Sequence, residues 1–118
     1  MSLSLLVGWI LLGTVAVGAL AYFWNDIKEW LNNTAVDAVE RALGYNARLN
    51  MQRAVSVADR IMQTVRIRST IYAKKNPLDF YIDKVIVEGS IPESSLDNDV
   101  IQEIKNKGSI VQEFVYQS

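Results

Sequence analysis

The stretch that decides the predicted fold is residues 3–24, LSLLVGWILLGTVAVGALAYFW. It contains no charged side chain, and its only polar members are Ser4 and Thr14. As an α-helix these 22 residues would reach about 33 Å, enough to cross a hydrocarbon core of about 30 Å. The sequence therefore predicts an N-terminal transmembrane helix over residues 1–24.

The residues around this run suggest how such a helix would sit in a bilayer. Amphipathic aromatic rings prefer the headgroup layer, so the membrane interface is predicted at Tyr22, Phe23, Trp24 and Trp30. Small residues let neighbouring helices approach closely, which makes Ser4, Gly8, Thr14 and Gly18 candidate packing positions. Residues 25–34 are predicted to form an interfacial linker.

Two other interpretations of the run are a cleaved signal peptide and a buried helix of a globular protein. No basic residue precedes the run, and it is longer than a usual signal core. The rest of a 118-residue chain offers little apolar mass to wrap such a helix. A single-pass membrane protein is therefore preferred. Lys28 and Arg41 follow the run and favour a cytoplasmic or interior location for the C-terminal bulk.

Residues 35–75 contain no proline and a single glycine, Gly44, and are predicted to form a long basic amphipathic helix. Apolar and small residues recur there at steps of three and four, which is typical of a helix with one apolar face. The predicted partner-binding stripe is Met51, Ala54, Ala58, Ile61 and Val65. Such a helix would be about 60 Å long, so another protein or a second copy would have to cover it.

The same segment is strongly basic, with seven basic residues against Asp59 over residues 48–75. The alternatives for this face are anionic lipid, an acidic protein surface and plain solvation. Nucleic acid is the least favoured partner, because no aromatic stacking residues are interleaved with the charges. The candidate basic face comprises Arg48, Arg53, Arg60, Arg66, Arg68, Lys74 and Lys75.

Residues 76–118 have a different composition, with eight acidic and three basic residues. Residues 80–88, FYIDKVIVE, are rich in aromatic and β-branched side chains and predict a strand. Asp97 is a plausible N-cap for a short helix ending before Gly108, and residues 110–116 predict a second strand. The segment is therefore predicted to be a small acidic β-α-β module.

The composition excludes several kinds of catalytic chemistry. The chain has no cysteine and no histidine, so thiol nucleophiles, disulfides, an imidazole base and the usual zinc ligand sets are absent. Carboxylates such as Asp79 with Asp83, or Asp97 with Asp99, are explained by strand edges and helix capping. We therefore expect no enzyme activity, no catalytic or metal-binding residue and no cofactor.

The predicted fold class is a mainly α membrane protein with one transmembrane helix, a long amphipathic helix and a small C-terminal module. The predicted function is a non-catalytic structural scaffold linking a bilayer to a larger assembly, such as a virion with an internal membrane. An accessory subunit of a membrane complex is another instance. The expected partners are lipid and other protein subunits, including copies of the chain itself. The alternative is a membrane-anchored regulator or immunity-type protein that binds through residues 76–118.

Overall fold

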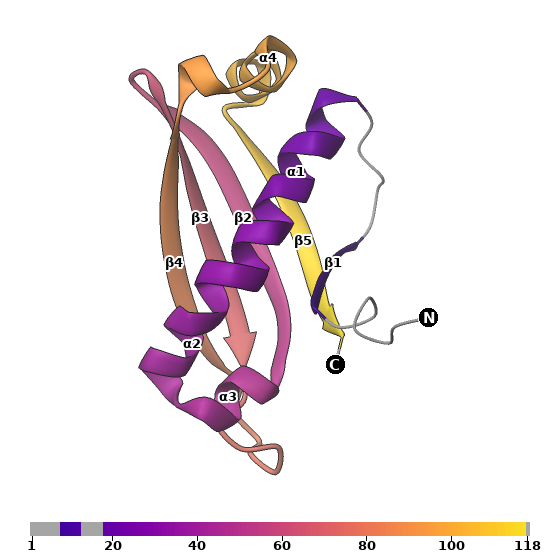
Figure 1. The fold of residues 1–118 in the computed structure, drawn as a ribbon, viewed down its shortest axis with the longest axis vertical. Helices are drawn as coiled ribbons and strands as arrows, with labels where there is room; N and C mark the ends of the chain where they lie inside the picture. The colour runs from indigo at the N-terminus through magenta and orange to yellow at the C-terminus, as the bar shows by residue number, and fades with distance from the viewer. Residues whose placement is uncertain (1–7, 13–17, 118) are drawn as a thin grey trace.

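The computed structural model describes residues 8–12 and 18–117 and shows an antiparallel sheet with helices on one face and at one end (Figure 1). The five strands lie in the order β1-β5-β2-β3-β4, and each neighbouring pair is antiparallel. β1 and β4 are thus the edge strands. The strands are β1 (Gly8–Leu12), β2 (Met51–Ile61), β3 (Thr64–Ala73), β4 (Asp83–Pro92) and β5 (Ser109–Gln117).

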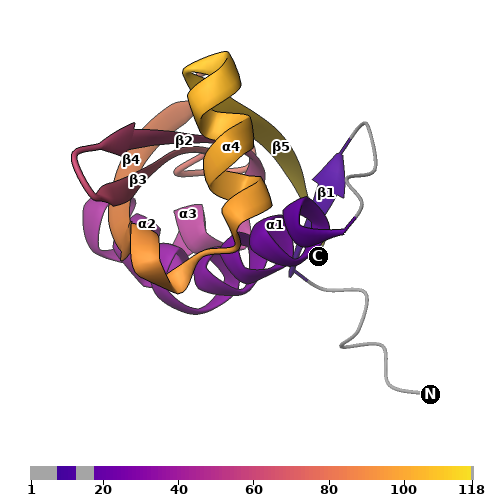
Figure 2. The same cartoon turned by 90° about the horizontal axis from the view of Figure 1, so that it is seen from above.

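A long helical stretch crosses one face of the sheet (Figures 1 and 2). It begins as α1 (Ala19–Trp30), continues through a π-helical turn (Leu31–Ala35) and ends as α2 (Val36–Leu43). Gly44 then takes a φ of 98°, a conformation that glycine reaches without steric cost, and the chain turns into α3 (Tyr45–Leu49).

The last helix connects β4 to β5 along the chain and lies across one end of the sheet (Figure 1). α4 (Asn98–Lys107) follows a single 3₁₀ turn (Glu93–Ser95). The Asp97 side chain accepts a hydrogen bond from the Asp99 amide at 2.9 Å and caps the helix.

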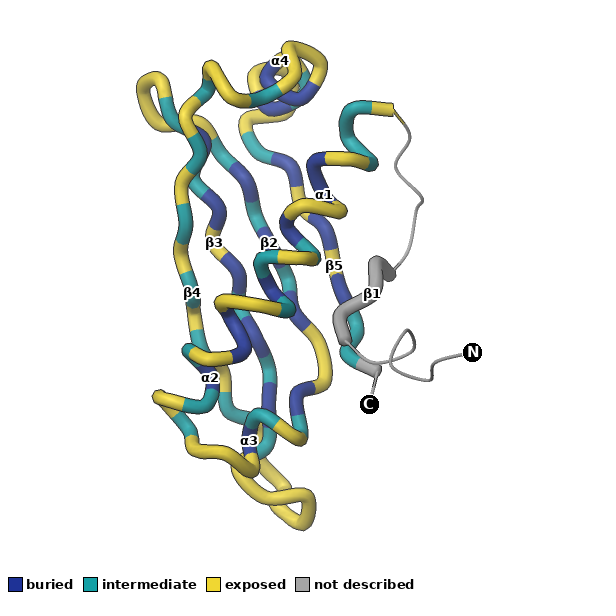
Figure 3. Tube along the Cα trace, viewed as in Figure 1, coloured by how far each residue is buried: buried dark blue, intermediate teal, exposed yellow. Residues whose placement is uncertain are grey.

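The core lies between the sheet and the helical stretch, because both elements are apolar on the sides that meet (Figure 3). Strand side chains alternate between faces, so one face of β2 and β3 buries every second residue. Phe114 on β5 is fully buried, and its ring lies edge-on to that of the buried Trp24 on α1. The buried set on the helical stretch is Phe23, Trp24, Ile27, Leu31, Ala35, Val36 and Val39.

The prediction of a single-pass membrane protein is wrong, and so is the membrane localisation derived from it. No helix in the described part of the chain is both long enough and apolar enough to span a bilayer. Part of the apolar run, Gly8–Leu12, is strand β1, and Ala19–Trp24 opens α1. α1 also carries the polar residues Asn25, Asp26 and Glu29 on an exposed side.

The prediction of a long amphipathic helix over residues 35–75 is also wrong. Its helical part ends at Leu49, and residues 51–73 form the hairpin of β2 and β3. The spacing of the apolar residues did not distinguish a helix from a strand. Two residues four positions apart lie on the same side of a helix and also on the same face of a strand. Ala54 and Ala58 show this, since both are fully buried on the helix-facing side of β2. Both strands contribute buried residues to the core that also contains the buried side chains of α1.

The C-terminal helix and the last strand match their predictions locally, whereas the strand predicted over residues 80–88 begins only at Asp83, and the three elements do not form a separate module. α4 runs from Asn98 to Lys107 after its Asp97 cap, and Gly108 follows it with a φ of 85°. The two strands, however, are not neighbours. β4 pairs with β3 and β5 pairs with β2, so residues 76–118 complete a sheet whose centre comes from residues 51–73.

Candidate functional site

The residues predicted at a membrane interface take different positions in the structure. Phe23 and Trp24 are buried, with the Trp24 ring against Phe114 of β5, whereas Tyr22 is exposed on α1. Trp30 is partly buried and its ring packs over Gly89 of β4. The predicted membrane-packing set is not brought together within the described residues. Gly8 lies in β1 and Gly18 precedes α1, while Ser4 and Thr14 lie outside the described residues.

The apolar stripe predicted on a helix is split between two strands. Met51, Ala54 and Ala58 are buried on β2, and Val65 is buried on β3. Ile61 lies at the end of β2 beside the hairpin turn and is 45% exposed. Four of the five residues therefore contact the chain's own core rather than an outside partner.

The predicted basic residues do not form one continuous basic face, because acidic neighbours pair with four of them. Arg48 lies near Asp37 and Glu40 of α2 at 3.3 and 3.4 Å. The other pairs are Arg60 with Glu93 at 2.8 Å, Arg66 with Asp59 at 2.6 Å and Arg68 with Glu88 at 2.8 Å. Arg53 stacks over the Tyr72 ring at 4.6 Å, and Lys74 and Lys75 follow β3 in a loop.

The Asp59–Arg66 pair is the best defined of these ion pairs. The Arg66 guanidinium donates two hydrogen bonds to the Asp59 carboxylate. Nε lies 3.1 Å from Oδ1, and Nη2 lies 2.6 Å from Oδ2. These hydrogen bonds favour the ionised acid and hold the pKa of Asp59 below its usual value. The two residues are directly opposite on β2 and β3, on the face away from α1. The pair thus cross-links two strands.

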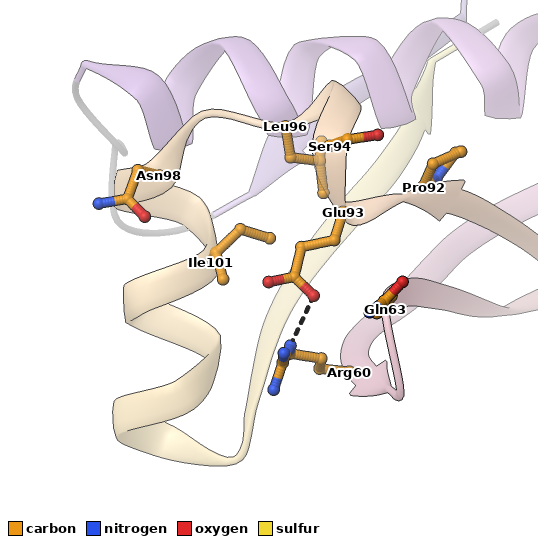
Figure 4. Close-up of a pocket in the computed structure, with 8 residues that line it drawn as sticks. All are labelled: Arg60, Gln63, Pro92, Glu93, Ser94, Leu96, Asn98 and Ile101. Atoms are coloured by element: carbon orange, nitrogen blue, oxygen red, sulfur yellow. Dashed lines mark hydrogen bonds and ion pairs between the residues drawn. The ribbon is translucent and has the colours of Figure 1, made fainter.

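A cleft of about 550 Å³ lies between the β2–β3 turn, the end of β4 and α4 (Figure 4). Arg60 and Glu93 meet inside it through their ion pair. Glu93 is the one acidic residue that lines the cleft, and it is paired with Arg60, the one basic residue there. The chain has no imidazole and no thiol group. Across the described residues no cluster of three potential metal ligands occurs. The lining residues are Arg60, Gln63, Pro92, Glu93, Ser94, Leu96, Asn98 and Ile101.

A surface feature of note is residues 76–82, which form most of the loop between β3 and β4. Four large apolar side chains stand out from it: Leu78, Phe80, Tyr81 and Ile82 are 88%, 98%, 83% and 50% exposed. The loop has a defined turn, in which the Asp79 amide donates to the Asn76 carbonyl at 3.0 Å. Asparagine followed by proline favours such a turn, and the Asn76 side chain also accepts from the Leu78 amide at 3.3 Å.

The loop leads directly into β4, an edge strand of ten residues. One side of β4 pairs with β3 along its whole length, and among the described residues no strand pairs with its other side. Its side chains alternate between half-buried and exposed, with Ile86 54% exposed. A long free strand edge can pair with another chain. Residues 76–92, the exposed loop together with β4, are referred to below as the edge surface.

Sequence reasoning missed this surface because it assigned Phe80, Tyr81 and Ile82 to the strand itself. Within a strand, alternate members of FYIDKVIVE would face a core. The available signal was Asn76-Pro77, a turn-forming pair placed immediately before four large apolar residues in the next five positions. In the structure β4 starts only at Asp83, which leaves these side chains in the loop.

Searches against protein-family models, curated proteins and solved structures found no match to this chain.

Proposed function

We propose that this chain is a non-catalytic protein-binding module that docks a partner protein on its edge surface. The observation that carries the proposal is the exposure of Leu78, Phe80 and Tyr81 beside the free edge of β4. The membrane-linking role is not retained, since it depended on a transmembrane helix. Binding through part of residues 76–118 is retained.

Burial of these side chains by a partner would be energetically favourable. Removing apolar area from water contributes roughly 25 cal/mol per Å², and an aromatic side chain can bury about 150–250 Å². Clustered exposed apolar residues mark interaction sites, and tyrosine is frequent among the residues that dominate binding energy. The free edge of β4 adds backbone hydrogen bonds, which give a bound segment its direction.

The absence of catalysis is proposed from the composition and the cleft. Without histidine and cysteine, a general base would have to be a carboxylate or a lysine. The single carboxylate in the cleft, Glu93, is held by Arg60 at 2.8 Å. This cleft therefore offers a neutralised ion pair rather than a reactive group.

Site-specific photo-crosslinking in the cells that make the protein tests the binding function. A benzoylphenylalanine at position 80 should give a discrete protein adduct, identified by mass spectrometry. The matched control is position 22, where Tyr22 is 77% exposed but lies on α1. Adding Leu78→Ser should weaken the adduct at position 80. Equal labelling at both positions, adducts with lipid alone, or no adduct at position 80 would contradict the proposal.

A further inference from the structure

We propose that the partner is a second copy of this chain, and that two β4 strands pair antiparallel about a two-fold axis at Ile86. This inference rests on the proposed function and names its partner. The two sheets would then join into one continuous sheet with both sets of helices on the same side. Three features of the edge surface support it: backbone direction, charge order and the position of the exposed loop.

The backbone direction of β4 follows from one hydrogen bond at its end. The Glu93 amide donates to the Gln63 carbonyl of the neighbouring hairpin at 2.9 Å. Backbone groups in an antiparallel strand alternate in direction, so the odd-numbered residues of β4 point toward β3. The even-numbered residues Lys84, Ile86, Glu88 and Ser90 therefore turn their N–H and C=O groups outward. Pro92, which has no N–H, lies at an outward position where none is required.

The order of charges along β4 is self-complementary in one register. With Ile86 on the axis, Lys84 of each copy lies opposite Glu88 of the other, and the two Ile86 side chains meet. Opposite charges across strands are stabilising, and like charges directly opposite are destabilising. Sliding the pairing by two residues sets Ile86 against a charged side chain. Sliding the pairing by four residues places two Lys84 or two Glu88 side chains directly opposite each other. A parallel pairing in register also places like charges opposite each other.

The same register gives the exposed loop a place to pack. When the strand direction is continued backward from β4, Ile82 comes opposite Ser90 of the second copy and Phe80 comes opposite its Pro92. Phe80 and Tyr81 from both copies would bury on the order of 600–1,000 Å². Together with the strand edges this approaches the ~1,200 Å² that the smaller stable interfaces bury.

A single cysteine substitution tests the register, because the chain contains no cysteine of its own. In the full chain, I86C should form a disulfide-linked dimer on mild oxidation, since opposite Cα atoms lie about 5.5 Å apart and a disulfide accepts about 4.4–6.8 Å. The matched control is S90C on the same strand face. Its two copies would be eight residues, or about 26 Å, apart and should stay unlinked. Crosslinking of S90C but not I86C would overturn the register.

A charge-swap series measures the contribution of the Lys84–Glu88 pairs by analytical ultracentrifugation. K84E places like charges at two points and should raise the dimer dissociation constant about tenfold. The double variant K84E/E88K should restore most of the affinity lost in E88K. That comparison is the relevant one, because Glu88 also pairs with Arg68 within one copy and both variants lose this bond. K105E, the same charge change on exposed α4, should have no effect.

The outcomes separate this inference from the proposed function. A chain that is monomeric in ultracentrifugation, yet crosslinks from position 80 to a different protein, overturns self-pairing and keeps the binding function. A monomer with no adduct at position 80 overturns both. A dimer that K84E leaves unchanged overturns the pairing of β4 strands.

Discussion

Trp30 and Gly89 are in direct contact at the edge of the sheet, where the indole ring lies over the glycine backbone. A Cβ atom added to Gly89 would lie 3.3 Å from Cζ2 of Trp30. The contact joins the end of α1 to β4, so it holds the edge strand against the helical layer. A residue predicted at a membrane interface thus packs within the chain.

Gly89→Val should destabilise the fold by about 1–3 kcal/mol, because the added side chain must displace the indole ring from a packed position. Urea unfolding followed by circular dichroism measures this change. In a Trp30→Leu background the cost of Gly89→Val should fall, since the smaller side chain leaves room. An equal cost in both backgrounds would show that this contact is not its cause.

Ser56 and Ser69 form the buried polar pair of the sheet, with their hydroxyl oxygens 2.6 Å apart and both residues fully buried. Replacing either residue by alanine leaves the other hydroxyl without this hydrogen bond and should cost about 1–3 kcal/mol. The double variant should cost less than the sum of the two single variants. Denaturant unfolding of all four proteins measures the coupling, and additive costs would contradict it.

The Asp59–Arg66 pair should make stability depend on pH at the acid end. Because Arg66 lowers the pKa of Asp59 in the folded state, this contribution is fully present above the ordinary aspartate pKa of about 4. It is lost as the pH falls from there through the lower folded value. Unfolding free energies measured from neutral pH down to the acid range should therefore fall less steeply for Asp59→Asn.

The matched control for this titration makes Asp59→Asn in an Arg66→Gln background, where the ion pair is already absent. In that background the substitution should change the steepness of the acid limb less than it does in the unchanged chain. If Asp59→Asn gives the same acid limb as the unchanged protein, the pair does not depress the pKa of Asp59 enough to affect folding.

Met62, in the turn between β2 and β3, has a φ of 56° although it is not glycine. A side chain in this left-handed conformation costs roughly 1–2 kcal/mol, part of which glycine recovers despite its greater freedom in the unfolded chain. Met62→Gly should therefore stabilise the protein by about 0.5–1 kcal/mol, measured by thermal and denaturant unfolding. Met62→Ala, which keeps the Cβ, should not stabilise it.

Short-range sequence signals predicted the C-terminal helix well. The Asp97 cap and Gly108 each act on backbone groups within one helical turn, so α4 needs little help from distant residues. The β-branched and aromatic content of residues 80–88 and 110–116 predicted two strands there, although β4 begins only at Asp83. Neither signal could indicate that β4 would pair with β3 and β5 with β2.

The N-terminal apolar run was misassigned because hydrophobicity alone does not say what covers it. A bilayer and a sheet both remove Phe23 and Trp24 from water, and the sheet depended on residues 51–73 being strands. β-Branched residues such as Val55, Val57 and Ile67 favour strands there. The sequence of β3 also alternates apolar and polar residues, as a strand with one buried face does. However, the spacing of four between Ala54 and Ala58 fits a helix as well as a strand.

By itself, the sequence determined the Asp97 cap and the terminal Gly108 of α4 and the lack of histidine and cysteine chemistry, because these depend on residue type and near neighbours. Only the tertiary structure decided which apolar side chains are buried. Burial depends on contacts between residues far apart in the chain, such as Trp24 with Phe114, and those contacts leave Phe80 and Tyr81 exposed beside a free strand edge.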